Sequence, residues 1–120
     1  MKKIILFCLL LSSFGVFAQE KTFAEIEKAA IAGDTSAQVN LGRMYCKGES
    51  LAKDFTKAFY WFEKAAIQSC PRGENGLGVL YYKGAGMAKD FTKAFYWWEK
   101  AANQGYATGQ YNLGNWYHYN

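Results

Sequence analysis

The chain has 120 residues, a formal net charge of +4 at pH 7, an aromatic content of 18% and a single proline. The charge is small and its lysines and arginines are spread along the chain, so nucleic-acid binding is not expected. The many aromatic residues are typical of a packed core and exclude an intrinsically disordered chain. The length suits one small domain.

The first 18 residues have the features of a secretory signal peptide. Lys2 and Lys3 precede an apolar run that ends at the small residue Ala18, which is the order of basic region, apolar region and cleavage site in such leaders. The apolar run of about 14 residues is shorter than the roughly 20 needed to span a bilayer. We therefore expect cleavage after Ala18, an exported protein that is periplasmic or secreted, and no stable membrane insertion after cleavage.

A repeat of 36 residues organises the rest of the chain. The segment 53–66 recurs at 89–102 with one difference, Phe62 against Trp98, and the Leu-Gly pair at 41–42 recurs at 77–78 and 113–114. This period is typical of stacked helix pairs, so we expect an all-α fold, an α-solenoid of antiparallel helix pairs. The predicted organisation is a signal peptide at 1–18, an N-terminal capping helix in 19–34, repeat 1 at 35–70, repeat 2 at 71–106 and a partial repeat 3, with its first helix only, at 107–120.

Each repeat predicts a first and a second helix. Asp54 and Asp90 stand where an N-cap residue accepts a bond from free backbone N–H groups, and Gly48 and Gly84 stand where a C-cap glycine ends a helix. Pro71 is harmless if it lies in the first turn of its helix, where its missing donor is not needed. The sequence predicts helices over 22–31, 36–46, 55–67, 72–82, 91–103 and 108–119.

Apolar residues at helical spacing identify the expected core. In the second helices the apolar face is Ala58, Trp61, Phe62, Ala65 and Ala66, and we expect Trp61 and its copy Trp97 to be core residues. In the first helices the expected stripe is Ala37, Leu41 and Tyr45 in the first copy and Gly109, Leu113 and Tyr117 in the last.

Glycines recur in the middle of the first helices, where each costs about 1 kcal/mol relative to alanine. Because Gly42, Gly78 and Gly114 share one position, we expect a packing reason, namely close approach of the second helix. Gly76 is replaced by Asn112 in the next copy, so we expect the architecture not to require it.

These motifs together resemble a known repeat. The segments that carry the resemblance are Ala37-Gln38-Val39-Asn40-Leu41-Gly42-Arg43-Met44-Tyr45, Gly48, Asp54, Lys57-Ala58 and Trp61-Phe62-Glu63-Lys64-Ala65-Ala66. They resemble the Sel-one-like repeat, a relative of the tetratricopeptide repeat, over nearly all of residues 22–120. The resemblance implies a right-handed, tetratricopeptide-like superhelix that acts as a scaffold for protein–protein contacts, and exported bacterial members are often tied to host interaction or cell-envelope processes.

The resemblance also implies where a partner binds. In tetratricopeptide solenoids the open face of the first helices lines a concave groove, which is the usual binding face of solenoids. The positions on this face differ between copies, whereas the core positions repeat, as expected for a binding face or for an exposed face under relaxed selection. The implied groove residues are Val39, Arg43, Cys46, Lys47, Asn75, Val79, Tyr82, Lys83, Tyr111, Asn115, His118 and Tyr119.

Catalytic and metal-binding motifs are sparse. Ser50 and Lys53 form an S-x-x-K pattern, which in penicillin-recognising enzymes places a nucleophile beside its lysine. The accompanying S-D-N and K-T-G motifs are absent, and Gly86 takes the serine's place in the next copy. His118 is the only histidine, which makes a metal site improbable. We expect no catalytic residue, metal or other cofactor.

Cys46 and Cys70 are expected to be free, part-buried thiols. Cys46 ends a first helix, whereas Cys70 follows the second helix and returns to the opposite end of the pair. About 11 residues of helix separate these ends by roughly 16 Å, and a disulfide needs Cα atoms within about 7 Å.

The sequence therefore predicts an exported, non-enzymatic scaffold that binds a protein or peptide in a concave groove. Two alternatives remain open. One is a cell-wall or β-lactam hydrolase, and the other is an architectural fragment of a longer repeat array, which the lack of a second helix after residue 119 would suit.

Overall fold

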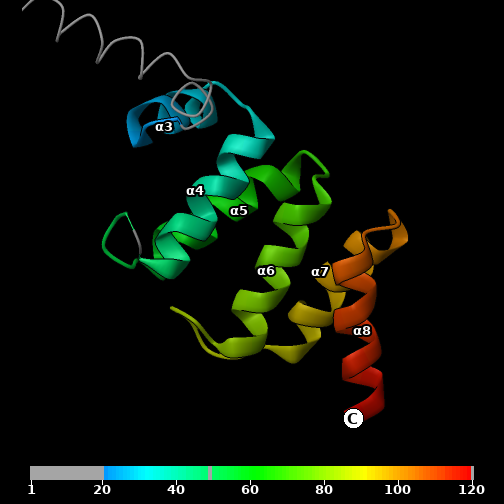
Figure 1. Cartoon of the computed structure of the whole chain (residues 1–120). Coiled ribbons are helices and arrows are strands. Elements are labelled where there is room, and N and C mark those ends of the chain that lie inside the picture. Colours follow the sequence, from blue (N-terminus) through cyan, green and yellow to red (C-terminus); the bar gives the residue numbers. More distant parts are fainter. Residues whose placement is uncertain (1–20, 49, 120) are drawn as a thin grey trace, which may run out of the picture.

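The computed structural model describes residues 21–48 and 50–119, and within them it contains six helices and no strand. The predicted signal peptide lies outside these residues. Consecutive helices pack against one another, and α4 also contacts α6, as α6 contacts α8. The all-α solenoid is therefore confirmed, with the first helices following one another across the molecule in Figure 1. The helices, labelled as in Figure 1, are α3 (Phe23–Ile31), α4 (Thr35–Lys47), α5 (Phe55–Ile67), α6 (Pro71–Lys83), α7 (Phe91–Asn103) and α8 (Ala107–Tyr119).

The helix ends follow the predicted capping residues. The carboxylates of Asp54 and Asp90 accept bonds of 3.0 Å from the backbone N–H groups of Lys57 and Lys93, which satisfies donors that the first turn leaves free. Gly48 ends α4 in the left-handed conformation, at φ 68°, where only glycine is unstrained. Every predicted helix agrees with the observed one to within one residue at each end.

The core is a stripe shared by neighbouring helices. Leu41 of α4 packs with Ala30 and Ala37 near the N-terminal helix, and a larger cluster continues through α5 and α6. The predicted stripe of α4 is buried throughout. In α8, by contrast, the predicted core residue Tyr117 is 64% exposed, because no described helix covers that side of α8. The members of the larger cluster are Val39, Tyr45, Ala58, Phe62, Ala65, Ala66, Leu77 and Leu80.

The mid-helix glycines of α4 and α6 mark close contacts with aromatic rings. A Cβ atom on Gly42 would lie 2.6 Å from Cε1 of Phe62, and one on Gly78 would collide with the indole of Trp98. Gly114 has the same place in α8, but a Cβ there would meet no atom within 4 Å. The predicted packing reason is confirmed for the first two glycines, and Gly114 has no second helix against it among the described residues.

Gly76 was expected to be dispensable, and this is wrong. A Cβ on Gly76 would lie 2.7 Å from Cδ1 of Phe62, so the Phe62 ring fits between two glycines, Gly42 on α4 and Gly76 on α6. In the next repeat Asn112 replaces Gly76 and lines the same pocket as Trp98, which replaces Phe62. The two positions are therefore not equivalent in packing.

Both Trp61 and Phe62 were predicted on the apolar face of α5, but only Phe62 and its counterpart Trp98 in α7 are buried. Phe62 and Trp98 are each 5% exposed, whereas Trp61 and Trp97 are only half-buried. One residue turns a helix by about 100°, which directs position 62 between α4 and α6. Trp61 instead lies at the border of the two buried clusters, against which it packs from outside.

Candidate functional site

The catalytic-looking pattern does not form a site in the described part of the chain. Ser50 and Lys53 are both exposed in the α4–α5 loop, and the Lys53 ammonium lies 5.7 Å from the centre of the Phe55 ring. Neither residue lines a pocket between the first helices. No group of three or more potential metal ligands occurs among the described residues. None of the described helices has the length and apolarity to span a membrane.

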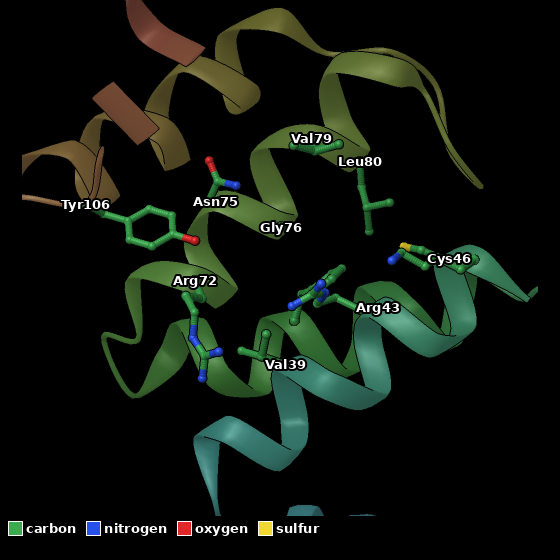
Figure 2. Close-up of a pocket in the computed structure, with 11 residues that line it drawn as sticks. Val39, Arg43, Cys46, Arg72, Asn75, Gly76, Val79, Leu80 and Tyr106 are labelled. Atoms are coloured by element: carbon green, nitrogen blue, oxygen red, sulfur yellow. The ribbon is translucent and has the colours of Figure 1, made fainter. Parts of the chain in front are cut away.

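The larger of two neighbouring hollows lies between the first helices α4 and α6, and Figure 2 shows the side chains around it. We call it the α4–α6 pocket; its volume is about 360 Å³. Val39, 2% exposed, and Leu80 supply apolar walls. Tyr106 reaches toward the pocket from the turn before α8 (Figure 2). Its lining residues are Val39, Arg43, Cys46, Lys47, Phe62, Arg72, Asn75, Gly76, Val79, Leu80 and Tyr106.

The charge of the α4–α6 pocket is entirely positive. Arg43, Lys47 and Arg72 line it, and no carboxylate does. Arg72 is held in place because its Nη2 donates a hydrogen bond of 3.1 Å to Oγ of Ser36. A cationic, partly apolar hollow of this kind favours an anionic group that carries or adjoins an apolar surface.

Cys46 is the one thiol in this pocket. Burial raises the pKa of the Cys46 thiol, and the ammonium groups of Lys83 and Lys53 oppose this rise. Because the thiolate is the nucleophilic form, a raised pKa describes an inert side chain and not an activated nucleophile. Cys46 and Cys70 are free thiols in the structure.

The second hollow, the α6–α8 pocket, lies between the next pair of first helices and has a volume of about 230 Å³. Three of its seven lining residues are aromatic. The ring of Tyr82 lies 5.4 Å from that of Trp98 and 6.3 Å from that of Trp116, measured between centroids. Its lining residues are Val79, Tyr82, Lys83, Trp98, Asn112, Asn115 and Trp116.

The two pockets are neighbours on one face of the solenoid. Val79 lines both of them. Asn75 of the first pocket accepts a hydrogen bond of 2.8 Å from Nδ2 of Asn112 of the second. A single extended ligand can therefore contact both hollows.

Most of the residues that the sequence assigned to a groove line these pockets. Tyr111 lies outside both, with 67% of its surface exposed, and His118 also lines neither. The side chain of Tyr119 lies outside the described residues. The residues in the α4–α6 pocket are Val39, Arg43, Cys46, Lys47, Asn75 and Val79, and those in the α6–α8 pocket are Val79, Tyr82, Lys83 and Asn115.

The sequence analysis did not predict the lining residues that lie outside the positions assigned to the groove. Phe62 and Trp98 reach the pockets from the second helices, and Tyr106 comes from a turn. Phe62 and Trp98 could have been found from the one difference between the otherwise identical segments 53–66 and 89–102, which falls at these two rings. The other missed residues are Arg72, Gly76 and Leu80 in the first pocket and Asn112 and Trp116 in the second.

Comparison with known proteins agrees with this architecture. The sequence model of the Sel1 repeat matches residues 35–70, 71–106 and 107–120. The crystal structure of a Sel1 repeat protein from Oxalobacter formigenes is similar, with 39% sequence identity over 78% of this chain and 71% of that chain and a TM-score of 0.68. The structure of c5321, a protective antigen present in uropathogenic Escherichia coli strains and displaying an SLR fold, is 36% identical. That likeness covers 82% of this chain but only 21% of c5321, with a TM-score of 0.78. No curated protein matches the chain.

Proposed function

This chain belongs to the Sel1 repeat family, and on that premise we propose that it is an exported scaffold that binds a protein or peptide partner along its first helices. Sel1 repeat proteins are generally non-catalytic scaffolds that bind protein partners. We further propose that this chain is exported, that its partner binds in the groove, and that it is not an enzyme.

The proposed binding face rests on one observation, the position of the two pockets. The two neighbouring pockets are bordered mainly by the first helices α4, α6 and α8. The second helices supply only one ring to each pocket, Phe62 or Trp98, and otherwise pack beside the first helices. The open side chains of the first helices therefore remain available to a partner, as in solenoids that bind with one face.

The export proposal rests on the first 18 residues and on a relative. Their basic start, apolar run and small residue at 18 have the order of a secretory leader. The similar protein c5321 is described as a protective antigen, and exposure outside the cytoplasm would suit that role. We place this chain in the periplasm or outside the cell.

A photocross-linking experiment in intact cells tests the binding face. A photoreactive amino acid is placed at Arg43 or Asn115, which line the pockets, and, as matched controls, at Tyr60 or Tyr96, which are exposed on second helices. We expect one discrete cross-linked product from positions 43 and 115 and none from 60 and 96. The reverse pattern would place the binding face on the second helices and refute the proposal.

A further inference from the structure

The two pockets are copies of one site, related by the repeat. Every residue that lines the α6–α8 pocket stands 36 positions after a residue that lines the α4–α6 pocket. Lys83 follows Lys47 in this register, and Trp98 follows Phe62. The groove therefore contains two equivalent pockets, one repeat apart, whose lining side chains differ in chemistry.

The first copy suits an acidic side chain. Arg43, Lys47 and Arg72 line it, and no carboxylate does. A glutamate or aspartate placed there gains charge-assisted hydrogen bonds from guanidinium groups.

The second copy keeps one cation, Lys83, but its aromatic rings suit a flat apolar side chain. In the repeat register, Val79 of the second copy replaces Arg43 of the first, and Asn115 replaces Val79. Trp116 likewise replaces Leu80. The rings of Tyr82 and Trp116, beside the largely buried ring of Trp98, offer edge and face contacts, which are favourable for another aromatic ring.

The expected spacing of the two copies fits a ligand in the polyproline II conformation. α4 contacts α6, and α6 contacts α8. Because packed helices lie about 8–10 Å apart, we take about this distance as the separation of equivalent points in the two pockets. A polyproline II chain rises about 3.1 Å per residue with three residues per turn, so side chains three apart face the same way at about 9 Å. In a strand, side chains on one face are only about 6.6 Å apart, which is too short.

The amides between the pockets suit the backbone of such a ligand. Asn75 and Asn112 are joined by a hydrogen bond where the two pockets meet, and each amide retains further donors or acceptors. A polyproline II backbone makes no internal hydrogen bonds and leaves its own groups available.

We propose that the groove binds a peptide segment in the polyproline II conformation that carries an acidic residue three positions from an aromatic residue. The acid occupies the α4–α6 pocket and the ring occupies the α6–α8 pocket. This inference rests on the proposed function, because it specifies the ligand of the same groove.

Synthetic peptides test the inference with the full exported chain. The probes are the acetylated, amidated hexapeptides Ala-Glu-Pro-Pro-Phe-Ala and its reverse Ala-Phe-Pro-Pro-Glu-Ala, because the polarity of binding is open. Binding is followed by NMR shift changes in the protein. We expect one of the two to bind at α4, α6 and α8. Replacing its Glu by Gln or its Phe by Ala should weaken binding about fivefold or more, and removing one Pro should do the same.

Charge reversal in the first pocket tests the contact with the acidic residue. Arg43→Glu should weaken binding of the Glu peptide about tenfold at low ionic strength, and it should improve binding of a peptide with Lys in place of Glu. Lys64→Glu makes the same charge change at an exposed position of α5 outside both pockets and should leave both affinities unchanged. Equal effects of the two variants would overturn the proposal.

Filling the α6–α8 pocket with a side chain tests the contact with the aromatic residue of the peptide separately from the contact with its acidic residue. Asn115→Phe places a ring in the α6–α8 pocket from an exposed position and should abolish the difference between the Phe and Ala peptides, whereas Asn103→Phe, exposed at the end of α7, should preserve it.

If no peptide binds while photocross-linking at Arg43 still captures a partner, this inference is wrong and the proposed function stands. If neither binding nor cross-linking occurs at the groove, both fail.

Discussion

The ring of Phe62 on α5 packs directly against Gly42 on α4, where a Cβ atom would lie 2.6 Å from its Cε1. The same ring fills the space beside Gly76 of the next repeat. One aromatic side chain thus joins the two helices of its own repeat and the first helix of the next. Both pockets are bordered by such a ring, Phe62 in one and Trp98 in the other.

Alanine at the shared glycine position should have opposite effects in α4 and α8. Gly42→Ala forces a methyl group into the Phe62 ring, and overpacking of this kind costs about 1–3 kcal/mol, which exceeds the gain of about 1 kcal/mol in helix propensity. Gly114→Ala meets no atom within 4 Å and should stabilise the protein by up to about 1 kcal/mol. Chemical denaturation of both variants measures this. Destabilisation by both would show that α8 is covered in the free protein.

Removal of the ring at position 62 should cost more than removal of the ring at position 61. Phe62→Ala should lower the free energy of unfolding by about 3–5 kcal/mol, as for a buried large aromatic residue. Trp61→Ala removes a half-buried side chain and should cost less. Equilibrium unfolding in urea compares the two variants, and a larger loss for Trp61→Ala would contradict the observed packing.

Glu74→Gln should stabilise the protein at neutral pH. Glu74 is 0% exposed, and its Oε1 accepts a bond of 2.8 Å from Nε2 of Gln104, whereas its Oε2 has no partner. The residue at this position in repeat 1 is Gln38, whose amide donates 3.0 Å to the carbonyl oxygen of Ala30. Satisfying a buried polar atom of this kind is worth about 1–3 kcal/mol.

The advantage of Glu74→Gln should also depend on pH. Burial raises the pKa of Glu74, opposed by the Lys100 ammonium and by the hydrogen bond from Gln104. Because the folded pKa lies above the unfolded one, the native protein loses stability as the pH rises from the unfolded value of about 4.3 through the folded pKa. The difference between the variant and the native protein should therefore be small in acid and grow toward neutral pH. Gln38→Glu should introduce the same pH dependence into repeat 1. A difference that is constant with pH would refute a raised pKa of Glu74.

Cleavage of the leader should occur after Ala18. N-terminal sequencing of the exported protein should then begin at Gln19, because the small residue at 18 follows the apolar run. An intact Met1 in the soluble fraction would show that the leader is retained.

The helices could be predicted from sequence because local signals and the repeat agree. The Asp54 and Asp90 caps and the 36-residue period placed both aromatic-rich second helices at their observed bounds. The packing partners could not be predicted in the same way. Whether position 61 or 62 is buried depends on where α4 and α6 lie, since both positions belong to the apolar face of α5.

In the candidate site, too, some residues could be predicted from the sequence and others could not. Residues on the open face of the first helices, such as Arg43 and Asn115, could be assigned by carrying the tetratricopeptide binding face onto the repeat register of this sequence. Tyr106 could not, because it reaches the α4–α6 pocket from a turn, and the positions of turns in space follow from tertiary packing. The requirement for Gly76 was hidden for a similar reason, because it depends on the ring of a different helix.

Lysine footprinting in intact cells tests the central claim, partner binding along the first helices, most directly. The chain provides two register-matched pairs of exposed lysines, Lys47 and Lys83 in the pockets and Lys64 and Lys100 on the second helices. Acetylation of each is compared by mass spectrometry between the protein in its native setting and the purified protein. The account predicts that Lys47 and Lys83 are protected in cells while Lys64 and Lys100 react equally in both. Protection of Lys64 and Lys100 with full reactivity of Lys47 and Lys83 would contradict it.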